Sequence, residues 1–271
     1  MDTQTYRLGF IGAGKLAGSV IRGLVRAKYC APREIIASEP NETLRHALRD
    51  EVNIHVTAEN GEVAEQAEII LLGVKPAVVL PVLRVVASLL DNKIVISLAA
   101  GVRLEAMQLA ANARFMRALT NTPSAICRGA TALARSARTT GEDVDMTRTL
   151  FSAIGVVVEV SELQIDAVTA LSGSGPAFVY TVIEALADGG KQMGLAPEVA
   201  LTLATQTVLG AAQLASESMM SPEELRKMVV TPGGTTAAGL AAMAKLKTSE
   251  GLIAAVKAAT ERGQEMAREN S

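Results

Sequence analysis

The stretch that decides the fold reads Arg7-Leu-Gly-Phe-Ile-Gly-Ala-Gly-Lys-Leu-Ala-Gly18. It places the pattern Gly12-x-Gly14-x-x-Ala17 between a strand-like apolar run and an amphipathic helix-like run. In that setting the first glycine permits a tight turn, the second lets backbone approach a pyrophosphate, and the small third residue lets helix and strand pack closely. The helix start then offers N–H groups to the phosphates. The alternative is a tight turn that holds no ligand, but this context favours dinucleotide binding. The residues expected to contact the cofactor here are Gly12, Ala13, Gly14, Lys15 and Leu16.

Outward from this stretch, strand and helix signals alternate. Short β-branched runs predict buried parallel strands at 8–11, 35–37, 69–74, 94–98 and 115–119, with a further pair at 130–134 and 156–160. Amphipathic stretches between them predict helices at 16–28, 42–50 and 78–90. Alternation of this kind predicts an α/β sheet with helices on both faces, that is, a Rossmann-type domain over residues 1–163.

Strand signals stop near residue 164, and an all-α domain is predicted over 164–271. Helices are expected at 177–193, 197–216, 222–228, 237–245 and 252–268. Residues 177–187 are apolar nearly all the way round, and such a helix is buried on every side. The helical domain is too small to bury that helix alone, so the sequence predicts an interlocked homodimer.

Two glycine-rich segments, 171–178 and 230–236, interrupt these helices and are interpreted as polar loops. They read Leu171-Ser-Gly-Ser-Gly-Pro-Ala-Phe178 and Val230-Thr-Pro-Gly-Gly-Thr-Thr236. Loops of this kind expose backbone N–H groups and hydroxyls beside helix starts, where a small anion can be held.

Further cofactor contacts are expected at the carboxyl ends of the strands, where open α/β sheets bind their ligands. Glu39, after the second strand, would bind the ribose hydroxyls of NAD and repel a 2′-phosphate, whereas Ser38 and Asn41 could donate to that phosphate. A solvated Glu39 is the alternative, and the choice between NADH and NADPH stays open. Asn60 either caps a helix or contacts adenosine.

Three later strands end in loops that lead toward the nicotinamide: Gly73-Val-Lys-Pro76, Ala99-Ala-Gly-Val102 and Thr120-Asn-Thr-Pro123. Lys75 either stabilises a negative group or supplies a proton, or is a surface lysine before a proline. Asn121 either holds the nicotinamide amide or forms an Asx turn. The residues predicted to contact the cofactor in these loops are Gly73, Val74, Lys75, Pro76, Ala99, Ala100, Gly101 and Asn121.

Composition narrows the function classes. Apolar residues make up 49% of the 271, aromatics only 3%, and the net charge is −2, which argues against a nucleic-acid surface. No uninterrupted apolar run reaches membrane-spanning length, and no secretory leader pattern is present, so we expect a cytoplasmic protein without a membrane span. The two cysteines, Cys30 and Cys127, lack metal spacing, and His46 and His55 supply no triad or zinc site. We expect buried thiols and no metal.

The motifs together resemble the pyrroline-5-carboxylate reductase family, over essentially the whole chain. The resemblance rests on the glycine loop, the 74–76, 99–102 and 121–123 loops, Ile165-Asp-Ala-Val-Thr169, and above all the segments 171–177 and 231–236. It implies NADPH- or NADH-dependent reduction of the cyclic imine 1-pyrroline-5-carboxylate to L-proline, the last step of proline biosynthesis. It also implies a homodimer at least, often built into a decamer.

The resemblance assigns the substrate to the second half of the chain. Thr236 would hydrogen-bond near the ring nitrogen as the main catalytic group, with Lys75 as a weaker candidate. The carboxylate would be held by backbone N–H groups of Gly233, Gly234 and Thr235. The full set of substrate-binding residues is Glu162, Thr169, Ser174, Gly175, Thr231, Gly233, Gly234, Thr235 and Thr236. The family often places small polar or basic residues where Glu39 stands, which puts NADPH preference in doubt.

Two alternatives differ in class. A β-hydroxyacid dehydrogenase would need a catalytic lysine a few residues after its glycine-rich segment, yet none follows Gly173 before Lys191. A non-catalytic dinucleotide-binding regulator would need the cofactor loop but not residues 231–236.

Overall fold

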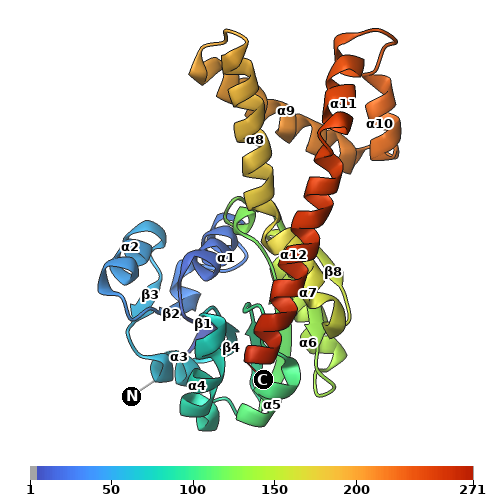
Figure 1. Ribbon diagram of the computed structural model, residues 1–271. Helices are drawn as coiled ribbons and strands as arrows, with labels where there is room; N and C mark the ends of the chain where they lie inside the picture. The colour runs from blue at the N-terminus through green and yellow to red at the C-terminus, as the bar shows by residue number, and fades with distance from the viewer. Residues whose placement is uncertain (1–4, 271) are drawn as a thin grey trace. The chain divides into compact units, whose positions relative to one another are not determined.

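The computed structural model describes residues 5–270 and divides into two compact units. One comprises the chain up to Ser174 together with the segment from Lys257 onward, and the other is Gly175–Val256 (Figure 1). The units therefore divide later than residue 163, and the end of the last helix returns to the first unit. The predicted domain boundary at residues 163/164 stays a prediction.

An eight-stranded sheet forms the centre of the first unit. Its strands are β1 (Tyr6–Ile11), β2 (Ile35–Ser38), β3 (His55–Thr57), β4 (Ala67–Leu72), β5 (Ile94–Ser97), β6 (Arg114–Leu119), β7 (Gly129–Arg135) and β8 (Gly155–Glu159). Their order is β3-β2-β1-β4-β5-β6-β7-β8, and every neighbouring pair is parallel except β6 and β7. The strand order reverses beside β1, so the ends of β1 and β4 flank the crevice in which such sheets bind ligands.

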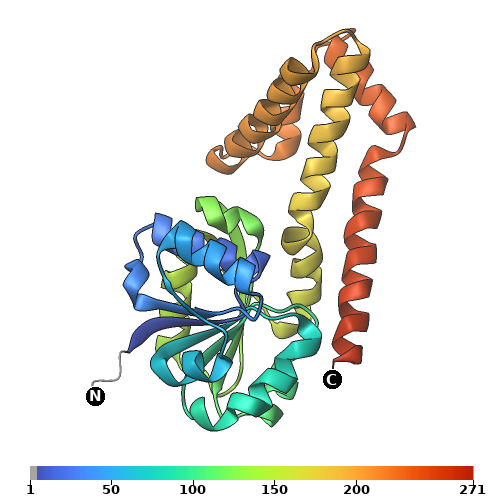
Figure 2. The ribbon, with the colours of Figure 1, turned by 90° about the vertical axis from the view of Figure 1, so that its left-hand side faces the viewer.

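Helices cover both faces of the sheet (Figure 2). The first unit contains α1 (Lys15–Arg26), α2 (Glu42–Val52), α3 (Asn60–Gln66), α4 (Pro76–Val86), α5 (Leu104–Ala110), α6 (Gly141–Ser152) and α7 (Ile165–Val168). One apolar core joins the sheet to α1 and α6, and a second joins it to α3, α4 and α5. Side chains such as Phe10 and Ile36 are fully buried between these layers. The predicted Rossmann-type fold is confirmed.

The sequence prediction missed the elements with the weakest patterns. The edge strand β3 has only three residues, none of them buried, so it lacks a continuous apolar run. The short helix α5 and the polar helix α6 were also not predicted. All the predicted strands are present, but β7 runs antiparallel to its neighbour β6.

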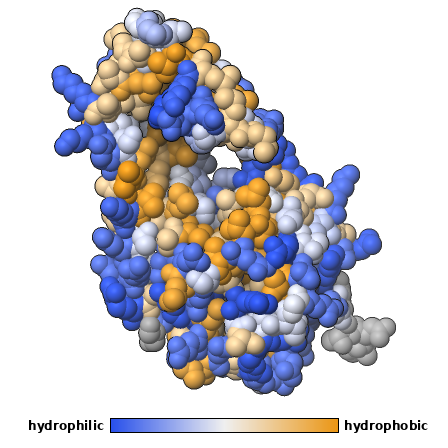
Figure 3. Space-filling view, turned by 90° about the vertical axis from the view of Figure 1, so that its right-hand side faces the viewer, coloured by the Kyte–Doolittle hydropathy of each residue, from blue (hydrophilic) through white to orange (hydrophobic). Residues whose placement is uncertain are grey.

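The second unit is built from helices alone. These are α8 (Gly175–Gln192), α9 (Pro197–Glu217), α10 (Pro222–Met228), α11 (Thr235–Lys245) and the first part of α12 (Thr248–Glu269). α8 and α9 pack together through Ala187, Ala200 and Ala204, with Ile183 beside them. Orange apolar residues remain exposed over this helical part in Figure 3. The large exposed side chains of α8 and α9 include Tyr180, Leu186, Leu203, Leu209 and Leu214.

The helix α9 is, by length and composition alone, able to cross a bilayer. The sequence contains no uninterrupted apolar run there, but α9 has few charges among its 21 residues. A helix whose apolar side chains pack in a protein interface meets the same criterion. The length and composition of α9 are therefore weak evidence for a membrane span.

The segment 171–178 is not a loop, contrary to the sequence interpretation. Thr169–Gly173 is π-helical and joins α7 to α8 with only Ser174 between them. The hydroxyls of Thr169 and Ser172 donate to carbonyls four residues earlier, at 2.8 and 3.0 Å, and the Ser174 N–H donates to the Thr169 carbonyl. The hydroxyls of Thr169 and Ser172 thus donate to carbonyls of the same helical segment, and the helix continues through the glycines.

Candidate functional site

The glycine loop joins the end of β1 to the start of α1. Gly12 has a φ of +85°, and an added Cβ would lie 2.6 Å from Val74 Cγ1. The Gly12 N–H donates to the Ser38 carbonyl at 3.1 Å, which fixes the turn against β2. Gly73 packs on the other side, where a Cβ would collide with the Gly12 carbonyl oxygen and with Ala17. Local packing therefore requires glycine at positions 12 and 73, and this packing holds the loop in place.

The space beside Gly14 is open. Gly14 is the N-cap of α1 and no side chain caps the helix, so its first N–H groups lack side-chain partners. A Cβ added at Gly14 would meet no atom within 4 Å. An uncapped helix start with open space in front of it suits a pyrophosphate. Ala13, Gly14, Lys15 and Leu16 are half-buried or exposed there, so they are available to a dinucleotide.

Ser38 and Asn60 bond to each other behind this loop. Ser38 is fully buried, and its hydroxyl lies 2.7 Å from Asn60 Oδ1 and accepts from the Gly12 N–H at 3.3 Å. The side chain of Ser38 thus supports the Gly12 turn from below. Asn60 is the first residue of α3, and the structure gives it a third role, as the partner of Ser38. A contact of Asn60 with adenosine stays a prediction, as does donation from Ser38 to a 2′-phosphate.

Glu39 lies at the tip of β2 beside a positive charge that the sequence did not point to. Its carboxylate accepts from the Asn41 N–H at 3.1 Å, while Asn41 Oδ1 caps α2. The guanidinium of Arg45 donates to the carbonyls of Glu39 and Pro40, at 2.7 and 3.3 Å. A cation therefore accompanies the acidic side chain where a 2′-phosphate would approach.

Lys75 precedes α4 at the end of the next loop. It is the N-cap residue, is exposed, and its side chain makes no cap hydrogen bond. Pro76 begins the helix, where its missing N–H costs nothing. The loop Gly73–Pro76 follows β4, adjacent in the sheet to β1, so it shares the carboxyl edge with the glycine loop.

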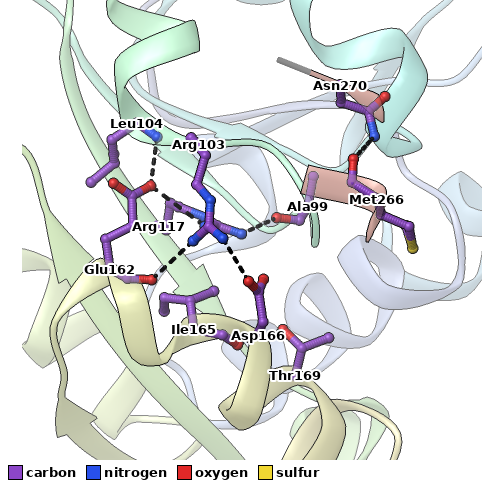
Figure 4. A network of polar contacts seen from close by, with 10 residues as sticks. All are labelled: Ala99, Arg103, Leu104, Arg117, Glu162, Ile165, Asp166, Thr169, Met266 and Asn270. Atoms are coloured by element: carbon purple, nitrogen blue, oxygen red, sulfur yellow. Dashed lines mark hydrogen bonds and ion pairs between the residues drawn. The ribbon is translucent and has the colours of Figure 1, made fainter. Parts of the chain in front are cut away.

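The Ala99–Val102 loop follows β5 and is held by a buried polar cluster (Figure 4). The Arg117 guanidinium donates to the Ala99 carbonyl at 3.3 Å and lies 3.5 Å from Glu162 Oε1. Arg103 donates to Asp166 Oδ2 at 2.7 Å and to the Glu162 carbonyl at 3.3 Å. Burial lowers the pKa of Arg117, and the two carboxylates oppose that shift.

Glu162 is thus occupied by contacts within the cluster. Its Oε1 accepts the Leu104 N–H at 2.6 Å in addition to facing Arg117. The structure shows a supporting role for Glu162, whereas the predicted contact with substrate stays a prediction. The sequence analysis did not single out this cluster; its one trace in the sequence is an arginine inside the apolar run 115–119, since a buried charge needs a partner, but the run does not tell which residues supply it.

Asn121 links β6 to the π-helical segment. Its amide Nδ2 donates to the Ser172 carbonyl at 3.0 Å, and its Oδ1 accepts from Ala130 N at 3.1 Å. Pro176 has no N–H to offer Ser172 four residues back, so Asn121 supplies the missing donor. Asn121 makes no side-chain cap, so it forms no Asx turn. Contact with the nicotinamide stays a prediction.

The substrate residues predicted in the second unit surround the start of α11. Gly233 has a φ of +70°, Gly234 is the N-cap, and its N–H donates to the Thr231 carbonyl at 3.0 Å. No side chain caps α11, so the N–H groups that follow Gly234, those of Thr235 and Thr236 among them, have no side-chain partners. This is a loop at a helix start, as the sequence predicted. Thr169, Ser174 and Gly175 lie apart from it in sequence, along the segment that leads into α8.

Comparison with known proteins places the chain in a family. Residues 162–266 match the model for pyrroline-5-carboxylate reductase dimerisation, and residues 7–101 match the model for NADP oxidoreductase, coenzyme F420-dependent. The pyrroline-5-carboxylate reductase of Synechocystis is 41% identical over 98% of this chain and 100% of its own length. The chain belongs to the pyrroline-5-carboxylate reductase family.

Solved structures agree with this membership. A pyrroline-5-carboxylate reductase from Coxiella burnetii is 33% identical, with a TM-score of 0.87, over 97% of this chain and 99% of its own. The Plasmodium falciparum pyrroline carboxylate reductase, solved with NADP bound, is 26% identical, with a TM-score of 0.89, over 98% of this chain and 99% of its own. The predicted family, an NAD(P)H-dependent oxidoreductase, is confirmed, and the helical half is the family's dimerisation region.

Proposed function

We propose that this protein reduces 1-pyrroline-5-carboxylate to L-proline with NADPH or NADH. The observation that carries the proposal is the uncapped, open glycine loop at the carboxyl edge of the sheet, in a chain that belongs to this reductase family over nearly its full length. The loop fits a dinucleotide, and the family defines the substrate.

The chemistry needs one hydride and one proton. The bound cofactor supplies a hydride to the ring carbon of the C=N bond, and the nitrogen gains a proton to become the amine of proline. Pyrroline nitrogen can take up its proton in solution before it binds, so the proposal requires no strong general acid. Catalysis then consists mainly of holding the ring in the correct orientation in a dry site.

The start of α11 is proposed to hold the substrate. Backbone N–H groups of Gly233, Gly234 and Thr235 would bind the carboxylate, since an uncapped helix N-terminus attracts anions. Thr236 would accept or donate a hydrogen bond near the ring nitrogen. Thr231 shapes this turn, because its carbonyl accepts the Gly234 N–H and its hydroxyl occupies the space that a Cβ at position 234 would need. Lys75 remains the second candidate for a catalytic group.

The assembly is proposed to be an interlocked dimer at least, built further into a decamer. The exposed leucines of α9 and the exposed side chains of α8 support a dimer, because an apolar surface of that extent marks an interface. We place the protein in the cytoplasm, without a metal or nucleic-acid partner, as composition and charge suggest.

The direct test is steady-state reduction of 1-pyrroline-5-carboxylate with NADH and NADPH side by side. Turnover with either cofactor supports the proposal. Tight cofactor binding without turnover would point to a non-catalytic regulator, and oxidation of a 3-hydroxyacid instead would point to a β-hydroxyacid dehydrogenase.

A further inference from the structure

Arg117 is a fully buried charge in β6. Its side chain is 0% exposed in β6, between Met116 and Ala118. The guanidinium reaches the Ala99 carbonyl and Glu162, but its Nε has no hydrogen-bond partner. Burying a charge with one long ion pair and one unsatisfied N–H is a costly way to stabilise a core. A methionine of similar length would fill the space without that cost, so a purpose other than stability is indicated.

The cluster around Arg117 fixes both ends of the Ala99–Val102 loop (Figure 4). At its start, Arg117 Nη2 holds the Ala99 carbonyl. Just beyond its end, the Leu104 N–H bonds to the same Glu162 carboxylate that faces Arg117, and Arg103 bonds to Asp166. The strand and the residues that follow the loop are therefore connected through the Glu162 carboxylate.

The end of α12 closes the opposite side of this loop. Gly101 has a φ of +64°, and a Cβ there would lie 2.8 Å from Met266 Cβ. Gly263 on the same helix packs against the Asp166 side chain, with 3.4 Å between an added Cβ and Asp166 Cβ. The loop thus lies between a charged cluster and the end of α12, which packs closely against Gly101.

We propose that Arg117 is a positioning residue for hydride transfer, which fixes the Ala99–Val102 loop where the nicotinamide ring is held. The inference rests on the proposed function and on the prediction from the sequence that this loop leads toward the nicotinamide. Arg117 itself touches neither substrate nor cofactor, and it acts through the Ala99 carbonyl. A displacement of about 1 Å at such a site lowers turnover by up to about a hundredfold.

The test is a double-variant cycle of Arg117→Met and Glu162→Gln. Arg117→Met leaves Glu162 without its cation, so both the unfolding temperature and kcat should fall, kcat by about tenfold or more. Adding Glu162→Gln removes the uncompensated charge and keeps the acceptor for the Leu104 N–H. The double variant should therefore regain most of the lost unfolding temperature while kcat remains low.

Arg114→Met is the matched control. Arg114 lies at the other end of β6 and bonds to Asp143 and the Asn92 carbonyl, away from the loop. The Arg114→Met protein should unfold at a lower temperature, while its kcat and KM stay unchanged. If Arg117→Met does not fold, Arg117→Lys keeps the charge, and its kcat should still fall because one ammonium cannot reproduce the guanidinium's contacts. Recovery of kcat together with stability in the double variant, or equal kcat values for Arg117→Met and Arg114→Met, would overturn the proposal.

Hydrogen exchange separates this inference from the proposed function. If the wild-type protein fails to reduce 1-pyrroline-5-carboxylate, the proposed function is wrong. The amides of residues 99–104 still report on the anchor, because they should exchange faster in Arg117→Met and not in Arg114→Met. Unchanged exchange in both variants would show that Arg117 does not hold the loop.

Discussion

The two compact units bury their apolar side chains to very different extents. In the sheet unit, strands such as β1, β4 and β5 are almost wholly buried between two layers of helices. Residues 175–256 bury only Ala187, Ala200 and Ala204, although the sequence of α8 is apolar on nearly every side. One unit completes its core from its own chain, whereas the other has apolar surface that a second chain must cover. When the sequence of a helix indicates burial but the helix is exposed in the single chain, the pattern therefore indicates that chains associate.

The largest expected effect comes from breaking that assembly. Leu209→Glu puts a charge on an exposed leucine of α9, which is 55% exposed in the single chain. Losing one buried leucine costs about 2 kcal/mol per subunit, so a dimer with two copies weakens roughly a thousandfold. Light scattering should show monomers, and turnover should fall with them.

The control for this variant is Gln206→Glu, which adds the same charge at an exposed polar position of the same helix. It should leave mass and activity unchanged. A Leu209→Glu protein that stays dimeric would show that this part of α9 faces solvent in the assembly.

A smaller effect is expected within the sheet unit, at the two glycines of the cofactor loop. Gly14→Ala adds a methyl group in open space, so the unfolding temperature should stay within about a degree or two while NADPH binds tenfold more weakly or worse. Gly12→Ala adds strain at φ +85° and a clash with Val74, so stability and binding should both decrease. Calorimetry and fluorescence titration with NADPH separate the two. Undiminished NADPH binding by the Gly14→Ala protein would show that the pyrophosphate does not bind at this loop.

The smallest expected effect concerns cofactor choice at the tip of β2. Glu39→Ser removes a negative charge near the 2′ position, and should raise the NADPH/NADH ratio of kcat/KM by roughly 1 kcal/mol, about fivefold. Arg45→Leu should shift the ratio in the opposite direction, because Arg45 is the adjacent cation. If neither substitution alters the ratio, then neither side chain faces the ribose.

Much of the fold follows from the sequence because its signals are local. The Gly12–Gly14 turn, the apolar strands and the α10 capping box at Ser221 and Glu224 are set by neighbouring residues. The prediction failed where tertiary partners decide. Asn121 bonds to Ser172 across 51 residues, and it supplies the Ser172 carbonyl with the donor that Pro176 lacks. Spacing along the chain gives no indication of such a pair.

In the candidate site, too, the residues set by local signals were predictable and those set by tertiary partners were not. Backbone positions in the glycine loop were predictable, because glycine itself signals an unusual backbone conformation or a close approach. The Arg117 cluster was not, because its members come from β6, the 103–104 segment and residues 162–166. Glu162 was singled out for substrate, but the structure shows its carboxylate bonded within that cluster.

Thr236 provides the most direct test of the central claim, that the sheet unit binds the cofactor and the start of α11 binds the ring of 1-pyrroline-5-carboxylate. Thr236→Ala should lower kcat/KM for 1-pyrroline-5-carboxylate by tenfold or more while the dissociation constant of NADPH stays unchanged, because one hydrogen bond to the substrate is worth roughly 0.5–1.5 kcal/mol or more when charge-assisted. Thr202→Ala, at an exposed α9 threonine that bonds only to the Glu198 carbonyl, is the matched control and should behave as wild type. Unchanged kinetics in Thr236→Ala, or a loss of NADPH affinity equal to the loss of turnover, would contradict the account.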